Sequence, residues 1–193
     1  MQNTMQQTHY TLQKKVFKIL GASFKIFDEN GNLCFFVNQK AFKLREDIRI
    51  YHDEAKTQEI LLIKARNIVD FSAVYDIFDS QTNEHIGALK RKGFKSMIKD
   101  EWILLDSVDQ EVGLIKEDSM ALALLRRFIT ALIPQTFEGF LSETRVFAFK
   151  QRFNPFILKI DLDFSDDSMH LLDRRIGICA AVLLGAVEGR QDN

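Results

Sequence analysis

Residues 173–190 read DRRIGICAAVLLGAVEGR, and no charged, amide or hydroxyl side chain occurs between Ile176 and Val187. A helix of these 12 residues is about 18 Å long, whereas the hydrocarbon core of a bilayer is about 30 Å thick. Charged residues flank the run, among them Arg175 and Glu188. The run is therefore too short to span a membrane, and it predicts a helix that is buried on all sides within the protein.

Small residues recur at intervals of four within this run, at Gly177, Ala181 and Gly185. This spacing places them on one face of a helix, where another part of the protein can approach closely. Each interior glycine costs about 1 kcal/mol in helix propensity. We therefore predict close packing of this face and a structural role for the three residues.

Whole-chain composition predicts a single folded domain. The 193 residues are 46% hydrophobic and 27% charged, which is enough to form one sizeable core. We expect a flexible N-terminal segment at residues 1–11 and one domain at residues 12–193. The formal net charge of −1 disfavours nucleic acid as a partner, because no bulk charge would attract it.

Two features favour a location in the cytoplasm. The N-terminal residues MQNTMQQTHYTLQKK lack the apolar core of a secretory signal, and no segment is long enough for a transmembrane span. Cys34 and Cys179 lie in apolar surroundings without a CxxC or Cys/His pattern, which is typical of packed thiols in a reducing compartment.

Short strands are predicted for most of the chain before this helix. In FILKIDLDF (residues 156–164), apolar residues at the even positions alternate with Lys159, Asp161 and Asp163. This alternation predicts a strand with one face in the core, to which Phe156 also belongs, and one face in solvent.

Three segments repeat one pattern: FKIFDENGNLCFFV, YDIFDSQTNEHIGALKR and WILLDSVDQEVGLIK. In each, an apolar strand ends in an Asp (Asp28, Asp79 or Asp106), and a polar turn leads into a returning strand. An Asp in this place can accept hydrogen bonds from turn amides, so we interpret these carboxylates as structural. Consecutive hairpins around one core predict a sandwich or a barrel.

Two helices accompany the strands. One is predicted at residues 120–133 with caps at Asp118 and Ser119, and the other is the C-terminal helix, with capping candidates at Ser165 to Ser168. A shell of strands and a fully apolar helix fit together when the helix threads the shell. We therefore expect a mainly β fold with two helices, in which a closed antiparallel barrel surrounds the buried C-terminal helix.

The hairpin repeat, the FKQRFNPFILKIDLDF strand pair and the ending LLDRRIGICAAVLLGAVEG resemble the LURP-one-related family, which is grouped with the Tubby C-terminal domain and the phospholipid scramblases. The resemblance covers residues 12–189, and its most specific part runs from Leu172 to Arg175. It implies an antiparallel barrel of about 12 strands around the C-terminal helix. It implies little about activity, because a fold does not fix a function.

The chain carries no recognised motif for catalysis or cofactor binding. Its four histidines are isolated, and HExxH, GxSxG, P-loop and dinucleotide glycine patterns do not occur. A barrel filled by its own helix also lacks the large cavity that small-molecule sites favour. We therefore expect a protein that is not an enzyme and uses no cofactor, with an unrecognised site formed by distant residues as the alternative.

An acidic stretch at residues 161–172, DLDFSDDSMHLL, suggests a cation site. Four side chains fall at positions 1, 3, 5 and 7 of a calcium loop: Asp161, Asp163, Ser165 and Asp167. The scramblase relatives have a calcium-binding proposal in the comparable region. The pattern fails because Asp166 replaces the required glycine and Leu172 the bidentate glutamate. We predict no metal site and keep Asp161, Asp163 and Asp167 as weak candidates.

A basic stretch at residues 89–99, LKRKGFKSMIK, is the better binding candidate. It gathers five cations around Gly93: Lys90, Arg91, Lys92, Lys95 and Lys99. Such a stretch can attract anionic headgroups by about 1 kcal/mol per cation, and Tubby-type relatives bind phosphoinositides. The alternative is a solvated hairpin tip, because alternation along a strand divides the charges between two faces.

Arg174 and Arg175 lie where the helix enters the barrel. We predict that at least one guanidinium meets strand carbonyls or an acidic partner such as Asp173, and we interpret all three residues as structural. The sequence favours a non-catalytic binding or scaffold module whose partner it does not name. The alternatives are a peripheral binder of anionic lipid or phosphoinositide at the cytoplasmic membrane surface, and an enzyme with an unrecognised site.

Overall fold

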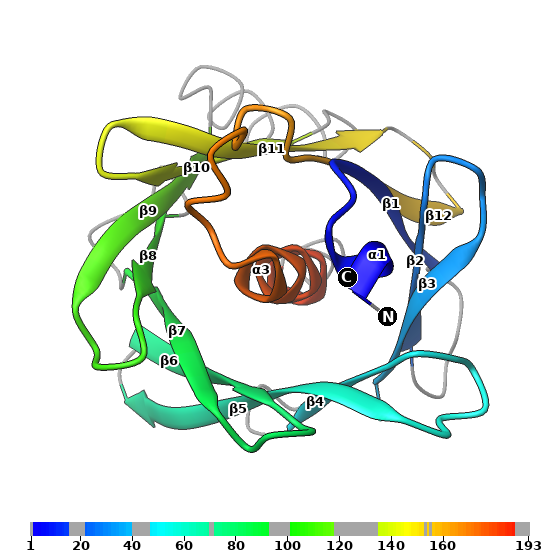
Figure 1. The fold of residues 1–193 in the computed structure, drawn as a ribbon, viewed down its shortest axis with the longest axis horizontal. Helices are drawn as coiled ribbons and strands as arrows, with labels where there is room; N and C mark the ends of the chain where they lie inside the picture. The colour runs from blue at the N-terminus through cyan, green and yellow to red at the C-terminus, as the bar shows by residue number, and fades with distance from the viewer. Residues whose placement is uncertain are drawn as a thin grey trace.

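The structure is a computed structural model that describes residues 2–15, 22–39, 47–69, 72–92, 101–117, 135–152, 154 and 156–187. Twelve strands form one closed barrel, in which sequence neighbours pair with each other and β1 closes the barrel against β12 (Figure 1). The strands are β1 (His9–Lys15), β2 (Ala22–Phe27), β3 (Leu33–Gln39), β4 (Ile48–Tyr51), β5 (Glu59–Val69), β6 (Ser72–Asp79), β7 (His85–Arg91), β8 (Glu101–Leu105), β9 (Glu111–Glu117), β10 (Thr136–Leu141), β11 (Thr144–Arg152) and β12 (Ile157–Asp163). The helices of the described residues are α1 (Gln2–Met5) and α3 (Arg174–Val187).

The predicted closed antiparallel barrel around an apolar C-terminal helix is confirmed. The second predicted helix, at residues 120–133, lies outside the described residues. Within residues 1–11, α1 precedes β1, which begins at His9. The flexibility of that segment, and the division of the chain at residue 12, remain predictions.

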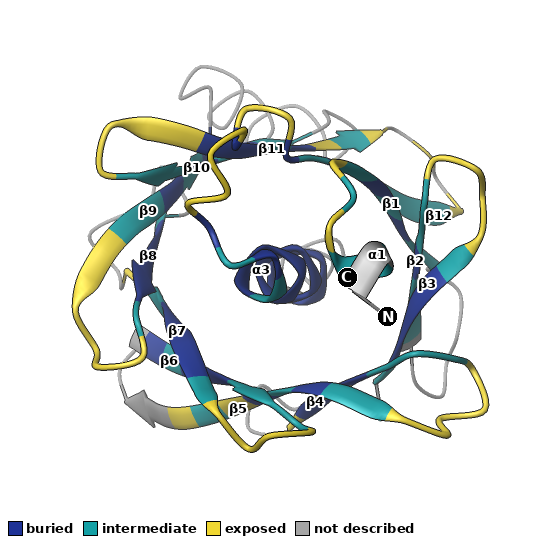
Figure 2. Cartoon of the chain, viewed as in Figure 1, coloured by how far each residue is buried: buried dark blue, intermediate teal, exposed yellow. Residues whose placement is uncertain are grey.

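Helix α3 lies inside the ring of strands and is buried around its whole circumference (Figure 2). From Ile178 to Leu184, no side chain is more than 2% exposed. The strands surround it with inward side chains such as Leu12, Phe24 and Ile77, each 0% exposed. The helix therefore forms the centre of the core. In the described part of the chain, no helix is long and apolar enough to cross a membrane.

The small residues of α3 make room for bulky strand and loop side chains. A Cβ atom on Gly177 would lie 2.5 Å from Cε1 of Phe164, which is far inside contact distance. A Cβ atom on Gly185 would lie 3.3 Å from Cε1 of Phe24, and Ala181 is 0% exposed. The closest approach is thus at Gly177, near the start of the helix.

Helix α3 is capped by Asp173. The Asp173 side chain accepts a hydrogen bond from the amide of Arg175 (2.9 Å), and its carbonyl accepts one from the amide of Ile176 (2.9 Å). The predicted caps at Ser165 to Ser168 are wrong, because those residues belong to a loop that separates β12 from the helix.

The alternation predicted for residues 156–164 holds within β12. Ile160 pairs with Leu12 of β1 and Leu162 pairs with Tyr10, and all four side chains are at most 5% exposed. Phe156 is an exception, since it is 65% exposed. Its predicted place in the core is wrong because β12 begins one residue later, after a turn in which Asn154 accepts the Phe156 amide.

In the repeated hairpin turns, the Asp side chains accept hydrogen bonds from backbone amides of the turn. The Asp28 carboxylate accepts the amide of Asn32 (2.7 Å), and Asp79 and Asp106 accept turn amides in the same manner. In two of these turns the residue three positions after the Asp has a left-handed backbone, with φ of 81° at Gly31 and 64° at Asp109. The predicted structural role of these carboxylates is therefore confirmed.

Candidate functional site

The described cations of the basic stretch each have a different neighbour. Lys90 on β7 lies 3.6 Å from a carboxylate oxygen of Glu111, and Lys92 lies 2.9 Å from one of Glu101. Arg91 instead lies with its guanidinium carbon 6.0 Å from the ring centre of Trp102, a residue that is 1% exposed. Lys95 and Lys99 lie outside the described residues.

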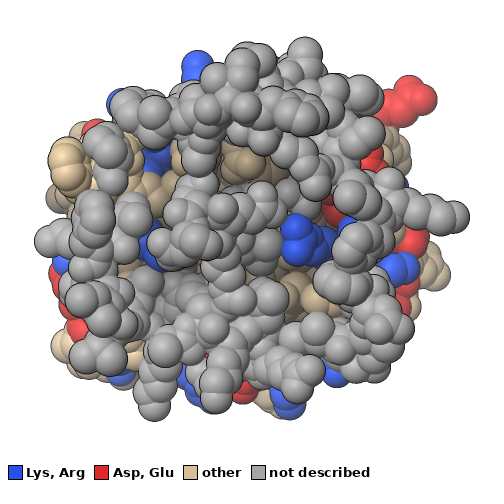
Figure 3. Space-filling view, turned by 180° about the vertical axis from the view of Figure 1, so that it is seen from behind, with Lys and Arg blue, Asp and Glu red and all other residues tan. Residues whose placement is uncertain are grey.

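Figure 3 shows the end of the barrel opposite to that of Figure 1, and on it the described Lys and Arg side chains appear at separate places. In these ion pairs the lysine side chains are exposed, at 40% for Lys90 and 46% for Lys92. Pairs of this kind contribute about 0–1 kcal/mol and exchange readily with solvent or ligand. The assignment of an anion-binding role to this stretch therefore remains a prediction.

The three weak cation candidates have three separate sets of partners. Asp161 pairs with Arg152, Asp163 lies 3.1 Å from Nε2 of His9, and Asp167 accepts the amide of Leu171 (2.7 Å). Asp161 and Asp163 are part of β12, whereas Asp167 lies in the loop that follows it. Among the described residues, no group of three or more His, Cys, Asp or Glu side chains is placed to hold a metal.

Arg175 fastens the start of α3 to the barrel wall. Its guanidinium donates to Asp173 (2.6 Å) and, across the barrel rim, to Asp79 at the end of β6 (2.8 Å). These hydrogen bonds raise the pKa of Arg175. The arginine thus connects the cap of the helix to one of the repeated hairpin turns.

Arg174 has a different environment although it is the adjacent residue. It is 8% exposed, and its guanidinium carbon lies 4.0 Å from the ring centre of Phe164. Its Nε and Nη1 atoms are buried without a hydrogen-bond partner among the described residues. Burial lowers the pKa of this guanidinium, while the nearby Tyr10 and Asp167 favour its charged form.

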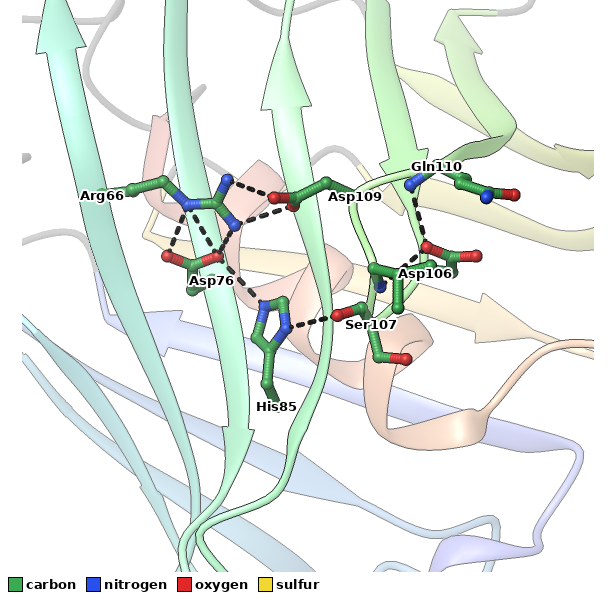
Figure 4. Close-up of polar contacts among 8 residues, drawn as sticks. Arg66, Asp76, His85, Asp106, Ser107, Asp109 and Gln110 are labelled. Carbon is green, nitrogen blue, oxygen red and sulfur yellow. Dashed lines mark hydrogen bonds and ion pairs between the residues drawn. The ribbon is translucent and has the colours of Figure 1, made fainter.

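A polar group that we call the outer-wall cluster consists of Arg66, Asp76, His85 and Asp109 (Figure 4). These residues come from β5, β6, β7 and the turn between β8 and β9. Arg66 donates from Nε to Asp76 (2.9 Å) and from its two terminal nitrogens to Asp109 (2.8 and 2.9 Å). The arginine thereby holds the β8–β9 turn against three neighbouring strands, and it lowers the pKa of Asp109.

His85 completes the cluster with contacts at both ring nitrogens. Its Nε2 atom lies 3.1 Å from the Asp76 carboxylate, and its Nδ1 atom lies 3.0 Å from the Ser107 carbonyl oxygen (Figure 4). Both ring nitrogens of His85 thus lie within hydrogen-bond distance of an acceptor oxygen, so the cluster is suited to holding strands and turn together.

Sequence reasoning did not find this cluster. Its contacts join residues 10 and 43 positions apart, and they depend on how the strands lie side by side. The single hint in the sequence was the polar Asp76 within the apolar strand SAVYDIFD. It is 8% exposed although it is on the outward face of β6, because Arg66 and His85 cover it.

Comparison with known proteins places the chain in a family. Among curated proteins, no sequence matches this chain at a significant level. The family described as LURP-one-related matches residues 33–163, which run from β3 to β12 and make up well over half of the 193 residues. The chain therefore belongs to the LURP-one-related family.

Proposed function

We propose that this protein is a non-catalytic binding or scaffold module of the cytoplasm, which acts through the rim and the outer surface of its barrel. The observation that carries this proposal is the position of α3. Because α3 fills the middle of the barrel with side chains at most 2% exposed from Ile178 to Leu184, we expect ligands at the ends of the barrel or on its outer surface.

The state of the most reactive side chains supports a function without catalysis. Burial raises the pKa of the Cys34 thiol to about 11, and it also raises the pKa of Cys179. Neither thiol is therefore a ready nucleophile at neutral pH. Both ring nitrogens of His85 lie beside acceptor oxygens, and the nearby carboxylates of Asp76 and Asp109 are paired with Arg66.

A thermal-shift screen of the full chain tests this proposal. The probes are inositol phosphates, anionic lipids, divalent metals and nucleotides. A ligand of the folded state present at 100 times its Kd stabilises the protein by about 2.7 kcal/mol, which moves the midpoint by several degrees. A ligand that shifts the midpoint and is recovered unchanged supports a binding module. A ligand that is chemically converted contradicts the absence of catalysis.

The second candidate function is binding to anionic phospholipid headgroups at the membrane surface. The observation in its favour is that Lys90 and its partner Glu111 are exposed, with side-chain accessibilities of 40% and 61%, so a headgroup could displace this ion pair at little cost. Binding to anionic liposomes should weaken with salt, since exposed charges are screened over about 8 Å at physiological ionic strength. Neutral liposomes should not bind.

Flotation with charge-neutralised variants separates this candidate from the first. Replacing Lys90, Lys92 and Lys95 together by Gln should remove most of the affinity and leave the thermal midpoint nearly unchanged. The control replaces three lysines outside the basic stretch by Gln: Lys25, Lys56 and Lys150. Equal flotation of both variants would show that lipid attraction is not a property of the basic stretch.

A further inference from the structure

The guanidinium of Arg174 is a buried charge in which two of the three nitrogens have no hydrogen-bond partner among the described residues. The residue is 8% exposed, and neither Nε nor Nη1 has a partner among the described residues. A guanidinium presents donors in a fixed planar fork, and burying it without acceptors is costly. Arg175 makes the contrast clear, because its guanidinium is bound by Asp173 and Asp79.

Aromatic rings hold the Arg174 guanidinium in place without satisfying its donors. One face lies against Phe164, with 4.0 Å between the guanidinium carbon and the ring centre. Phe164 is in turn fixed by Phe149 at 5.4 Å and by Tyr10 at 6.1 Å between ring centres. A stacked guanidinium keeps its edge available, and that edge is where carboxylates and phosphates bind.

The N-terminal segment, residues 2–8, lies at this end of the barrel, where α1 appears within the ring of strands (Figure 1). Two hydrogen bonds attach the segment: the Tyr10 hydroxyl donates to the Thr4 carbonyl (2.8 Å), and the Phe164 amide donates to the Thr8 carbonyl (2.8 Å). Met5 packs against the core. Tyr10 and Phe164 therefore contact both the segment and the environment of Arg174.

We propose that Arg174 anchors a binding site for a carboxylate group of a ligand, and that residues 2–8 cover this site until the ligand displaces them. The proposal deepens the binding function proposed above and rests on it. It explains why an arginine with unsatisfied donors is kept inside an aromatic core. The same position filled by an apolar side chain would serve packing equally well.

The surroundings favour a carboxylate over a phosphate. Asp167, 3% exposed, lies near enough to interact electrostatically with Arg174 but forms no ion pair with it within 4 Å. Its oxygens accept the amides of Leu171 (2.7 Å) and Leu172 (3.2 Å). Since this negative charge is already present, a planar group with a single charge suits the site better than a dianion.

Side-chain NMR of the ¹⁵N-labelled full chain tests the proposal. The Arg174 Nε–H signal is assigned as the arginine signal that disappears in Arg174→Met. The protein is then titrated with sodium propionate, sodium phosphate and sodium chloride at equal ionic strength. We expect the Arg174 signal to move and to saturate with propionate, and to respond weakly to phosphate and not at all to chloride.

A variant that weakens the attachment of residues 2–8 tests whether they cover the site. Tyr10→Phe removes the hydrogen bond to Thr4, so the apparent Kd for propionate should fall by about 2- to 10-fold. Tyr75→Phe, which removes a buried hydroxyl from β6, is the control and should leave the Kd unchanged. No response to propionate in either the wild type or Tyr10→Phe would overturn the site, and an equal response to phosphate would overturn its assignment to carboxylates.

Stability provides a second and independent readout. If Arg174 is kept for a ligand, Arg174→Met should unfold at the same temperature as the wild type or higher, because an uncompensated charge has been removed. A clear drop in the midpoint would show that Arg174 is needed for folding and would overturn the proposal. Arg174→Lys keeps the charge but not the fork, so it should fold normally and lose propionate binding.

The two proposals fail in different ways. If the thermal-shift screen finds a ligand whose effect is unchanged in Arg174→Met, the protein is a binding module but the Arg174 site is wrong. If the screen finds only ligands that are turned over, the binding function itself is wrong, whatever propionate does.

Discussion

Two glycines on α3 allow one substitution to be compared in two packing environments. Gly177→Ala and Gly185→Ala both add a methyl group to the same buried helix. Each gains about 0.5–1 kcal/mol, because alanine has the better helix propensity. The variants differ in what the new methyl group meets.

At Gly177 the methyl group has no room. It would lie 2.5 Å from Cε1 and 2.9 Å from Cζ of Phe164, whereas carbon atoms prefer about 3.5–4.0 Å. The Phe164 ring is 1% exposed and packs against Phe149 and the Arg174 guanidinium, so it cannot move aside freely. Overpacking of this kind costs about 1–3 kcal/mol, and we take the upper part of that range. The net effect of Gly177→Ala is then a loss of about 1–2 kcal/mol.

At Gly185 the methyl group makes near-normal contacts. Its nearest neighbours would be Phe24 at 3.3 Å, Leu12 at 3.5 Å and Ile160 at 3.6 Å, so a small shift of the Phe24 ring suffices. We expect Gly185→Ala to be neutral or to stabilise the protein by up to about 1 kcal/mol. The two variants should therefore differ by about 2 kcal/mol, or about 4–8 °C in Tm.

Thermal unfolding followed by circular dichroism, with urea denaturation as a check, measures this difference. The wild-type midpoint should lie between those of the two variants or close to that of Gly185→Ala. Equal midpoints for the two variants, or a more stable Gly177→Ala, would refute the tight contact between the start of α3 and Phe164.

The remaining predictions concern the core and the barrel rim. Gly185→Leu adds more volume than the site can accept and should destabilise by at least about 1–3 kcal/mol, seen as a lower urea midpoint. Burial opposes ionisation of Asp79, but hydrogen bonds from turn amides and from Arg175 outweigh it and lower the pKa of this carboxyl. The resulting stabilisation is present above the unfolded pKa of about 3.9 and is lost as the pH falls through the folded value, so Asp79→Asn should lose less stability than the wild type between pH 7 and pH 3. Cys34 and Cys179, whose pKa values are raised by burial, should resist iodoacetamide at pH 7.5 and react fully in denaturant, as measured by mass spectrometry.

Local sequence patterns were sufficient for the main features of the fold. The apolar run from Ile176 to Val187 predicted a buried helix because its length excludes a membrane span and its composition excludes a solvent-facing side. The even-numbered apolar residues of β12 predicted its inward face, which the register with β1 confirms. In both cases a single element contains the whole signal, because burial is reflected in its own periodicity.

Local patterns failed where a boundary depends on one residue. The alternation was extended to Phe156, but a turn at Asn154 starts β12 after it and leaves the ring 65% exposed. Similarly, Ser165 and Ser168 have the chemistry of helix caps, yet the hydrogen bonds that start α3 come from Asp173. Several residues near such a boundary could cap the helix or begin the strand, and tertiary packing determines which of them does.

Polar side chains that act across strands had no local signal at all. Arg66 and Asp109 are 43 residues apart, and their contact exists because β5 to β9 are consecutive strands of one closed sheet whose β8–β9 turn bends toward Arg66. The same limit applied to Arg174 and Arg175, which look equivalent in the sequence. The Arg175 guanidinium donates to Asp79, whereas the Arg174 guanidinium lies against Phe164 and leaves Nε and Nη1 without a partner among the described residues. The difference in direction between two adjacent side chains thus separates a structural contact from a proposed ligand site.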